Sequence, residues 1–209
     1  MSSKKTDATR RAIVGATIGV GLGIGSLSLL APVVSLRPKK EVSPETEPPK
    51  EGDLLTFAVG DKAGKVVTFD DLPLEGPAVL AYPKDPKTGV IKSGEKNNLV
   101  LLIRLKPDEL DDEVKKYSAD GAVCYSAICT HLGCTVGEWD ASRGLFLCPC
   151  HKGLFDPRHG AEVVAGPPPR PLPTLPIRAD GNKPVVAGGF TSPPGVLAGT
   201  TAAGGSCAV

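Results

Sequence analysis

Short hydrophobic runs, separated by glycine, proline and aspartate, recur along the first half of the chain. They cover residues 54–59, 65–69, 78–82 and 99–103. Pairs of turn-forming residues, such as Gly60-Asp61 and Gly76-Pro77, lie between the runs. Apolar runs of this length bounded by turn residues are typical of β-strands. The pattern therefore predicts a β-rich domain, to which residues 175–178 and 184–186 should return as strands.

A helical pattern is predicted at one place, between Pro107 and Tyr117. Proline lies near the start, acidic residues fill the first turns and two lysines come last, as helix ends prefer. Leu110, Val114 and Tyr117 would share one face of this helix. We expect that face to pack on the sheet.

The longest apolar stretch, residues 12–36, contains no charged residue. As a helix it would be roughly 37 Å long, which is enough to cross a bilayer. Four basic residues precede it, Lys4, Lys5, Arg10 and Arg11. We therefore predict a single-pass anchor in the cell (inner) membrane, with a cytoplasmic N-terminus and the rest of the chain on the outer or periplasmic side. A cleaved signal peptide is the alternative, and the paired arginines also resemble a twin-arginine export signal.

Composition and charge exclude two classes of protein and predict two segments without a core. The 24 Lys+Arg and 23 Asp+Glu residues give a net charge of +1, which excludes a strongly basic nucleic-acid binder. A hydrophobic content of 41% excludes a wholly disordered chain. Residues 37–53 are rich in proline and charge and predict a flexible tether, whereas residues 188–209 are rich in Gly and Ala and predict a tail without a core.

The expected organisation has seven parts. They are a basic cytoplasmic N-terminus (1–11), an anchor (12–36), a tether (37–53), the first part of a β domain (54–120), a region rich in Cys, Gly, His and Pro (121–173), the returning strands (174–187) and the tail (188–209).

Two short segments rich in cysteine and histidine carry the candidate chemistry. Residues 129–134 read CTHLGC and residues 148–151 read CPCH. Two thiolates and two imidazoles brought together from two loops make a metal site. The spacing fits neither covalent haem attachment, nor a plant-type ferredoxin, nor a thioredoxin motif. A structural zinc site stays open, although zinc would not need the additional cysteines Cys134 and Cys150.

CTHLGC followed by CPCH resembles the Rieske iron–sulfur proteins of bacterial cytochrome bc complexes, the quinol–cytochrome c reductases. Residues 166–173, GPPPRPLP, are similar to the proline loop that shields the cluster in this family. The resemblance implies a mainly β fold, a Rieske-type antiparallel β-sheet head with a small cluster-binding subdomain, preceded by one N-terminal transmembrane helix. It also implies a 2Fe–2S cluster as the cofactor.

The resemblance assigns the four cluster ligands by position. Cys129 and Cys148 would bind one iron through sulfur. His131 and His151 would bind the other iron through imidazole nitrogen. Residues expected around the cluster are Leu132, Gly133, Lys152, Gly153, Phe155 and Pro168.

Cys134 and Cys150 would form a disulfide between the two loops, as in the bc-type family, and an exported domain favours that bond. Gly153 and Phe155 stand where the family commonly has a serine and a tyrosine whose hydroxyls donate to cluster sulfur. Fewer hydrogen bonds to sulfur predict a reduction potential in the lower part of the bc-type range. Such a potential suits a low-potential quinol such as menaquinol.

The implied activity is that of a one-electron carrier in the oxidation of a membrane quinol. His151, or in second place His131, would accept a hydrogen bond from the quinol. One electron would pass through the head to a c-type cytochrome, and the other to haem in a cytochrome b subunit. The alternative function is a Rieske subunit of another exported oxidoreductase, such as arsenite oxidase.

Two further residues have simple interpretations. Cys124 is expected to be a small buried thiol, with a second disulfide to Cys207 as the alternative. His159 lies in a predicted turn and is expected to be solvated.

Overall fold

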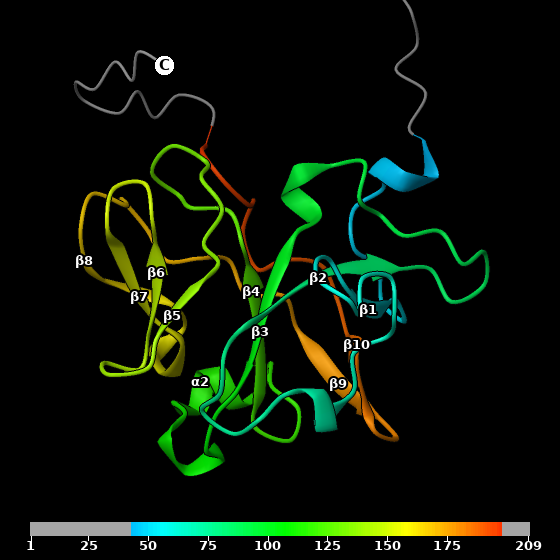
Figure 1. Ribbon diagram of the computed structural model, residues 1–209, viewed down its shortest axis with the longest axis horizontal. Coiled ribbons are helices and arrows are strands. Elements are labelled where there is room, and N and C mark those ends of the chain that lie inside the picture. Colours follow the sequence, from blue (N-terminus) through cyan, green and yellow to red (C-terminus); the bar gives the residue numbers. More distant parts are fainter. Residues whose placement is uncertain (1–42, 198–209) are drawn as a thin grey trace, which may run out of the picture. The chain divides into compact units, whose positions relative to one another are not determined.

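The computed structural model describes residues 43–197, which form two antiparallel sheets (Figure 1). The six-stranded sheet has the order β4-β3-β2-β1-β10-β9. Its strands are β1 (Leu54–Phe57), β2 (Val79–Lys84), β3 (Val100–Arg104), β4 (Ala122–Ser126), β9 (Ile177–Asp180) and β10 (Lys183–Val186). The four-stranded sheet has the order β5-β6-β7-β8. Its strands are β5 (Glu138–Asp140), β6 (Leu145–Cys148), β7 (Gly153–Asp156) and β8 (Glu162–Ala165). The mainly antiparallel β fold is as predicted.

Strand β3 separates two hydrophobic cores, because successive side chains of a strand point to opposite faces of its sheet. Leu101 and Ile103 belong to one core, which also contains Phe146 of β6. Val100 and Leu102 belong to the other core, on the opposite face of the sheet. Burial on both faces explains why this stretch of sequence is continuously apolar rather than alternating.

Most of the predicted strands are present, and the run at residues 65–69 is the exception. Within it, Val66 makes only an isolated bridge to Thr56. Phe69 begins a 3-10 helix, η2 (Phe69–Asp71), whose start is capped by reciprocal hydrogen bonds between Thr68 and Asp71. This capping box ends the extended conformation early.

The single helix predicted between Pro107 and Tyr117 is wrong in its extent. The segment forms a 3-10 helix, η4 (Pro107–Glu109), and a short α-helix, α2 (Asp112–Lys115). Leu110 lies between them with extended backbone and a buried side chain. Leu110 and Val114 still pack into the core as expected. The remaining 3-10 helices are η1 (Pro44–Thr46), η3 (Lys96–Asn98) and η5 (Pro157–His159).

The flexible tether predicted over residues 37–53 is wrong for the part that the structure describes. The Asn98 side chain donates to the Glu47 carbonyl, and the Gly94 amide donates to the Glu45 carbonyl. Asp53 is buried against Lys92. Charge and proline content predicted a solvated coil, but these polar groups find partners on the folded head, so residues 43–53 belong to it.

The tail predicted from residue 188 is also wrong as far as residue 197. Phe190 packs against the second core, and the Thr191 amide donates to the Thr174 carbonyl. The predicted start of the cluster-binding region, residue 121, is too early, because β4 pairs with β3 in the six-stranded sheet. The strands predicted near residues 175–186 return to that sheet as β9 and β10.

Several predictions fall on residues 1–42 and 198–209, which lie outside the described part of the chain. They include the basic N-terminus, the anchor at residues 12–36, the twin-arginine signal and any disulfide to Cys207. Between residues 43 and 197 no helix is long and apolar enough to span a bilayer.

Candidate metal centre

Two loops carry the predicted metal ligands. Loop 1, residues 129–134, connects β4 to β5, and loop 2, residues 148–151, turns from β6 to β7. Loop 1 is closed at its base by a hydrogen bond from the Cys129 amide to the Cys134 carbonyl, 2.8 Å long. Loop 2 is closed by the pairing of Cys148 with Gly153. Each loop therefore presents its cysteine and histidine from a fixed strand end.

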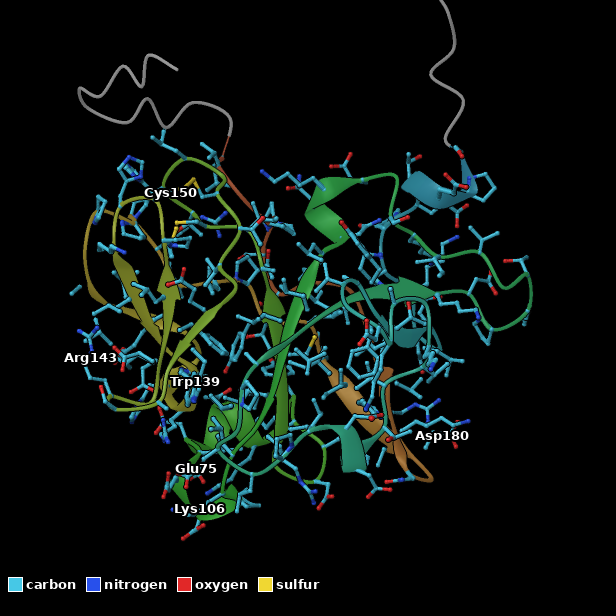
Figure 2. All side chains as sticks on the ribbon, viewed as in Figure 1. Glu75, Lys106, Trp139, Arg143, Cys150 and Asp180 are labelled. Atoms are coloured by element: carbon cyan, nitrogen blue, oxygen red, sulfur yellow. A yellow bond between two sulfur atoms is a disulfide. The ribbon has the colours of Figure 1, made fainter. Side chains whose placement is uncertain are left out.

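Cys134 and Cys150 form a disulfide that joins the two loops, which confirms the predicted pair. The sulfur atoms of this disulfide and of Cys148 all lie within 4.8 Å of one another. Disulfide sulfurs are not thiolates, so these three residues are not a three-cysteine metal site. Figure 2 shows Cys150 and neighbouring sulfur at one end of the four-stranded sheet, opposite the end with Trp139 and Arg143.

The two candidate sulfur ligands are buried. Cys129 is 2% exposed and Cys148 is 1% exposed. Burial raises the pKa of the Cys129 thiol to about 11, while backbone hydrogen bonds from His131 and Leu132 to its sulfur act in the opposite direction. A bound cation would supply the charge that a buried thiolate needs, because a coordinating thiol is deprotonated.

The two candidate imidazole ligands lie side by side. The ring centroids of His131 and His151 are 4.7 Å apart and their planes make an angle of 82°. The Nδ1 atom of His131 is buried and has no hydrogen-bond partner within the described residues. A buried ring nitrogen in this state is what a metal ligand requires, because buried polar atoms are otherwise paired. His151, in contrast, is exposed.

The donor set therefore fits the implied cofactor. Two thiols and two imidazoles from two loops are brought to one end of a sheet and clamped by a disulfide. Thiolate and imidazole ligands suit iron–sulfur and zinc centres alike. The geometry supports a metal centre of either kind. Similarity to known proteins distinguishes an iron–sulfur centre from a zinc centre.

The proline loop, residues 166–173, covers loop 2 closely. A Cβ placed on Gly153 would lie 2.6 Å from Cγ of Pro168, and one on Gly166 would lie 2.8 Å from Cα of Gly153. Gly166 also has a φ of +93°, which favours glycine. The ring of Phe155 borders Gly153 and is fully buried in the first core. Glycine at 153 and 166 thus allows two backbones to approach each other.

The other residues expected around the cluster lie at the surface of the loops. Leu132 is 40% exposed at the tip of loop 1. Gly133 and Lys152 both have a positive φ, of +77° and +56°. Cys124 is a fully buried thiol, as predicted.

Three residues that hold loop 1 in place were not identified from the sequence: Thr130, Arg170 and Lys96. The hydroxyl of Thr130 donates to the Arg170 carbonyl, 2.7 Å away, and so connects loop 1 to the proline loop. The ammonium of Lys96 donates to the Gly133 carbonyl at 2.6 Å. Thr130 and Arg170 lie inside the recognised motifs, whereas the position of Lys96 follows only from the packing of η3.

Comparisons with known proteins match this region. The Rieske [2Fe-2S] domain family matches residues 86–176. A protein of Haloferax mediterranei, named as a respiratory nitrate reductase subunit Rieske, is 41% identical over 58% of this chain and 52% of its own length.

Cytochrome bc1 complex Rieske iron-sulfur subunits are also similar. That of Streptomyces lividans is 42% identical over 37% of this chain and 46% of its own length. That of Mycobacterium tuberculosis is 28% identical over 89% of this chain and 52% of its own length. The chain spans about half the length of these relatives.

Proposed function

This chain belongs to the Rieske [2Fe-2S] proteins, and from that premise we propose that it is the electron-transfer subunit of a respiratory cytochrome bc complex. The 2Fe–2S cluster of the domain would be held by Cys129 and Cys148 on one iron and by His131 and His151 on the other. The observation that carries the assignment is the buried Nδ1 of His131, which has no hydrogen-bond partner within residues 43–197.

His151 is the residue proposed to meet the quinol. It is the exposed histidine of the pair, whereas the ring of His131 is partly covered. The ring nitrogen of a metal-bound imidazole that faces away from the metal can accept a hydrogen bond from a hydroxyl and can hold a proton. When bound, the cluster supplies one-electron chemistry. Cys129 and Cys148 are buried, so the sulfur ligands would lie on the side of the site away from water.

Menaquinol is the proposed quinol. Gly153 and Phe155 offer no hydroxyl group to cluster sulfur. A reduced site with fewer hydrogen bonds to sulfur is less stable, so its reduction potential is lower. A low potential matches a low-potential quinol.

The proposed partners are a cytochrome b subunit and a c-type cytochrome in the cell membrane. The bc1 subunits of Streptomyces lividans and Mycobacterium tuberculosis support these partners through their names. The basic N-terminus and the apolar residues 12–36 support a single-pass anchor with the head outside. Because residues 43–53 pack on the head, residues 43–197 would move between partners as one unit.

A second candidate is a Rieske subunit of a different respiratory oxidoreductase. The 41% identity to the Haloferax mediterranei protein, named for nitrate reductase, supports it. Purification of the chain from its native membrane distinguishes the two functions. Co-purification of b-type haem indicates the bc complex, whereas co-purification of a molybdenum subunit indicates the alternative.

Electron paramagnetic resonance of the reduced full-length chain tests the ligand assignment. We expect the rhombic signal of a mixed-ligand 2Fe–2S cluster, and its loss in His131→Ala and His151→Ala. His159→Ala is the matched control, because the chain has three histidines and His159 lies beside Asp156 instead. A reduced protein that binds zinc and gives no such signal would overturn the proposal.

A further inference from the structure

We propose that residues 190–197, here called the C-terminal strap, form part of the structure that shields the cluster, and that Arg170 is the positioning residue that holds the strap against loop 1. The proposal rests on the ligand assignment made above. It gives a role to a segment that composition alone had identified as a tail.

Arg170 connects the strap to the proline loop. Its Nη2 atom donates to the carbonyl of Pro193 at 2.7 Å and to the carbonyl of Gly195 at 2.5 Å. Its Nη1 atom lies 3.4 Å from the Ser192 hydroxyl. The planar guanidinium has several donors in a fixed arrangement and can span neighbouring carbonyls, which a lysine ammonium cannot do with the same geometry.

The backbone of the same arginine supports loop 1. Its carbonyl accepts the hydrogen bond from the Thr130 hydroxyl, and Thr130 is 2% exposed and directly precedes His131. The side chain and the backbone of Arg170 therefore join three segments, the strap, the proline loop and loop 1. A movement of the strap would change the surroundings of Arg170 and of Thr130 together.

The strap also touches loop 1 and its base directly. A Cβ on Gly195 would lie 3.2 Å from Ile128 and 3.2 Å from Asn97, so the strap backbone is close to both residues. A side-chain methyl of Val196 lies 4.0 Å from the position of a Cβ on Gly133. The strap thus borders loop 1 at Gly133, whose carbonyl also accepts the hydrogen bond from Lys96.

Part of the strap is not closely packed. Phe190 and Pro194 of the strap line a cavity of about 270 Å³ together with Thr46, Pro48 and Pro49. Residues 190 and 191 are held by the second core and by the Thr174 carbonyl. Beyond them, the hydrogen bonds from Arg170 hold the strap on loop 1 rather than over the cavity.

The position of the strap should affect the reduction potential. The shell around a metal site controls the access of water, and solvent exposure is one of the determinants of the potential of iron–sulfur clusters. The reduced site carries one more negative charge than the oxidised site, and water stabilises the more highly charged state. Displacement of the strap should therefore raise the potential.

Gly195→Val in the full-length chain tests the proposal without changing any charge. Gly195 has a φ of +73°, which strains any side chain, and a Cβ there would lie 3.2 Å from Ile128 and from Asn97, so the strap and these neighbours must shift apart. Gly181→Val is the matched control. Gly181 has a φ of +57° with nothing within 4 Å, and the turn next to Asp180 lies far from Cys150 (Figure 2).

We expect Gly195→Val to accelerate hydrogen exchange of the loop 1 amides at residues 131–133 by about tenfold, because local opening controls their exchange. We also expect its reduction potential to rise while the paramagnetic signal is kept. Gly181→Val should leave both quantities unchanged. Equal exchange rates and potentials in Gly195→Val and the wild type, or equal changes in both variants, would overturn the proposal.

Arg170→Lys provides a second measurement if Gly195→Val does not fold. It keeps the positive charge and loses the forked hydrogen bonds, so exchange in loop 1 should again accelerate. The exchange rates of the loop 1 amides report the position of the strap whichever residues bind the cluster. A wild-type chain without the rhombic signal would overturn the proposed function, whereas unchanged exchange would overturn the strap alone.

Discussion

Lys152 and Gly153, the two residues that follow loop 2, differ in what the structure requires of them. The left-handed backbone conformation that suits glycine falls on Lys152 and not on Gly153. Lys152 has a φ of +56°, a conformation that favours glycine. Gly153 follows and lies under Pro168, where no side chain fits without movement. Steric demands therefore explain the glycine at 153, while nothing in the structure explains the lysine at 152.

Lys152→Gly should increase the free energy of unfolding by about 1 kcal/mol, because a left-handed conformation costs a non-glycine residue about that much. Urea unfolding of the variant and the wild type measures the difference. Lys87→Gly is the control, since Lys87 is exposed and has no positive φ. The explanation fails if the two glycine variants change stability equally.

Gly153→Ser should raise the reduction potential only when Pro168 is also made smaller. The hydroxyl could then donate to cluster sulfur and stabilise the reduced state, but Cβ of the serine would otherwise lie 2.6 Å from Pro168. We expect the Gly153→Ser, Pro168→Ala variant to have a higher midpoint potential than Gly153→Ala, Pro168→Ala. Equal midpoints in a redox titration would show that the missing hydroxyl does not lower the potential.

At the scale of elements, η5 joins the four-stranded sheet to the six-stranded one. Arg158 donates to Glu109, the last residue of η4, at 3.0 Å and to the Gly144 carbonyl in the β5–β6 turn at 2.8 Å. It also contacts Glu75 at 3.3 Å. Figure 2 shows Glu75 and Lys106 together below the end of the sheet marked by Trp139. One arginine thus connects the four-stranded sheet with the segments that carry Glu75 and Glu109.

Arg158→Lys should lower the free energy of unfolding by about 1–2 kcal/mol, because lysine cannot make the same separate hydrogen bonds to Glu109 and Gly144. Arg143→Lys is the matched control on the same sheet. Arg143 is 52% exposed and pairs only locally with Asp140, so its replacement should cost less than about 0.5 kcal/mol. Denaturant unfolding of both variants measures the difference, and equal losses would contradict a bridging role.

His159 adds a contact between η5 and α2 that depends on pH. Its side chain is exposed, as predicted, and its Nδ1 lies 3.0 Å from Asp156 while its Nε2 lies 3.7 Å from Asp111. The hydrogen bond with Asp156, together with the negative charges of Asp156, Asp111 and Glu162, raises the pKa of His159. The protonated form is therefore favoured in the folded protein.

His159→Gln should destabilise the protein below about pH 6.5, the pKa of an unperturbed histidine. The stabilisation by His159 is fully present below that pH and is lost as the pH rises through the raised pKa of the folded state. The ring is 45% exposed, so the loss should be a few tenths of a kcal/mol. Unfolding measured at pH 5.5 and pH 9 should show a difference between variant and wild type only at the lower pH.

At the scale of the whole molecule, a buried ion pair attaches residues 48–53 to the head. Lys92 is 1% and Asp53 is 4% exposed, and their charged atoms are 2.6 Å apart. The Lys92 ammonium also donates to the Pro48 carbonyl. A buried charge without its partner is costly. The folded head therefore begins well before the first strand.

Lys92→Met should lower the free energy of unfolding by about 3–5 kcal/mol, because it leaves Asp53 buried without its cation. Lys92→Met combined with Asp53→Asn should recover part of this loss. Lys62→Met, which breaks the exposed pair with Asp71, should cost less than about 1 kcal/mol. Urea unfolding measures all three variants, and a small effect of Lys92→Met would mean that residues 48–53 are not part of the cooperative unit.

The sequence was sufficient for those features that depend on local pattern. Alternating and continuous apolar runs predicted five strands of the six-stranded sheet, and the two cysteine–histidine motifs predicted the disulfide and the family. The capped turn at Thr68 and the extended Leu110 were missed, because both depend on what the neighbouring segments offer as partners. The folded state of residues 43–53 and 188–197 was missed for the same reason, because their composition is typical of a solvated chain.

The sequence alone thus determined the β class, since this follows from residue type and order, and the family resemblance added the pairing of Cys134 with Cys150, which the structure contains. Only the tertiary structure decided where the head begins and ends and what surrounds loop 1. Partners such as the buried Lys92 and the half-buried Arg170 lie far along the chain from the segments they hold. Hydrogen bonds and burial between distant segments have no periodicity in the sequence, so packing had to reveal them.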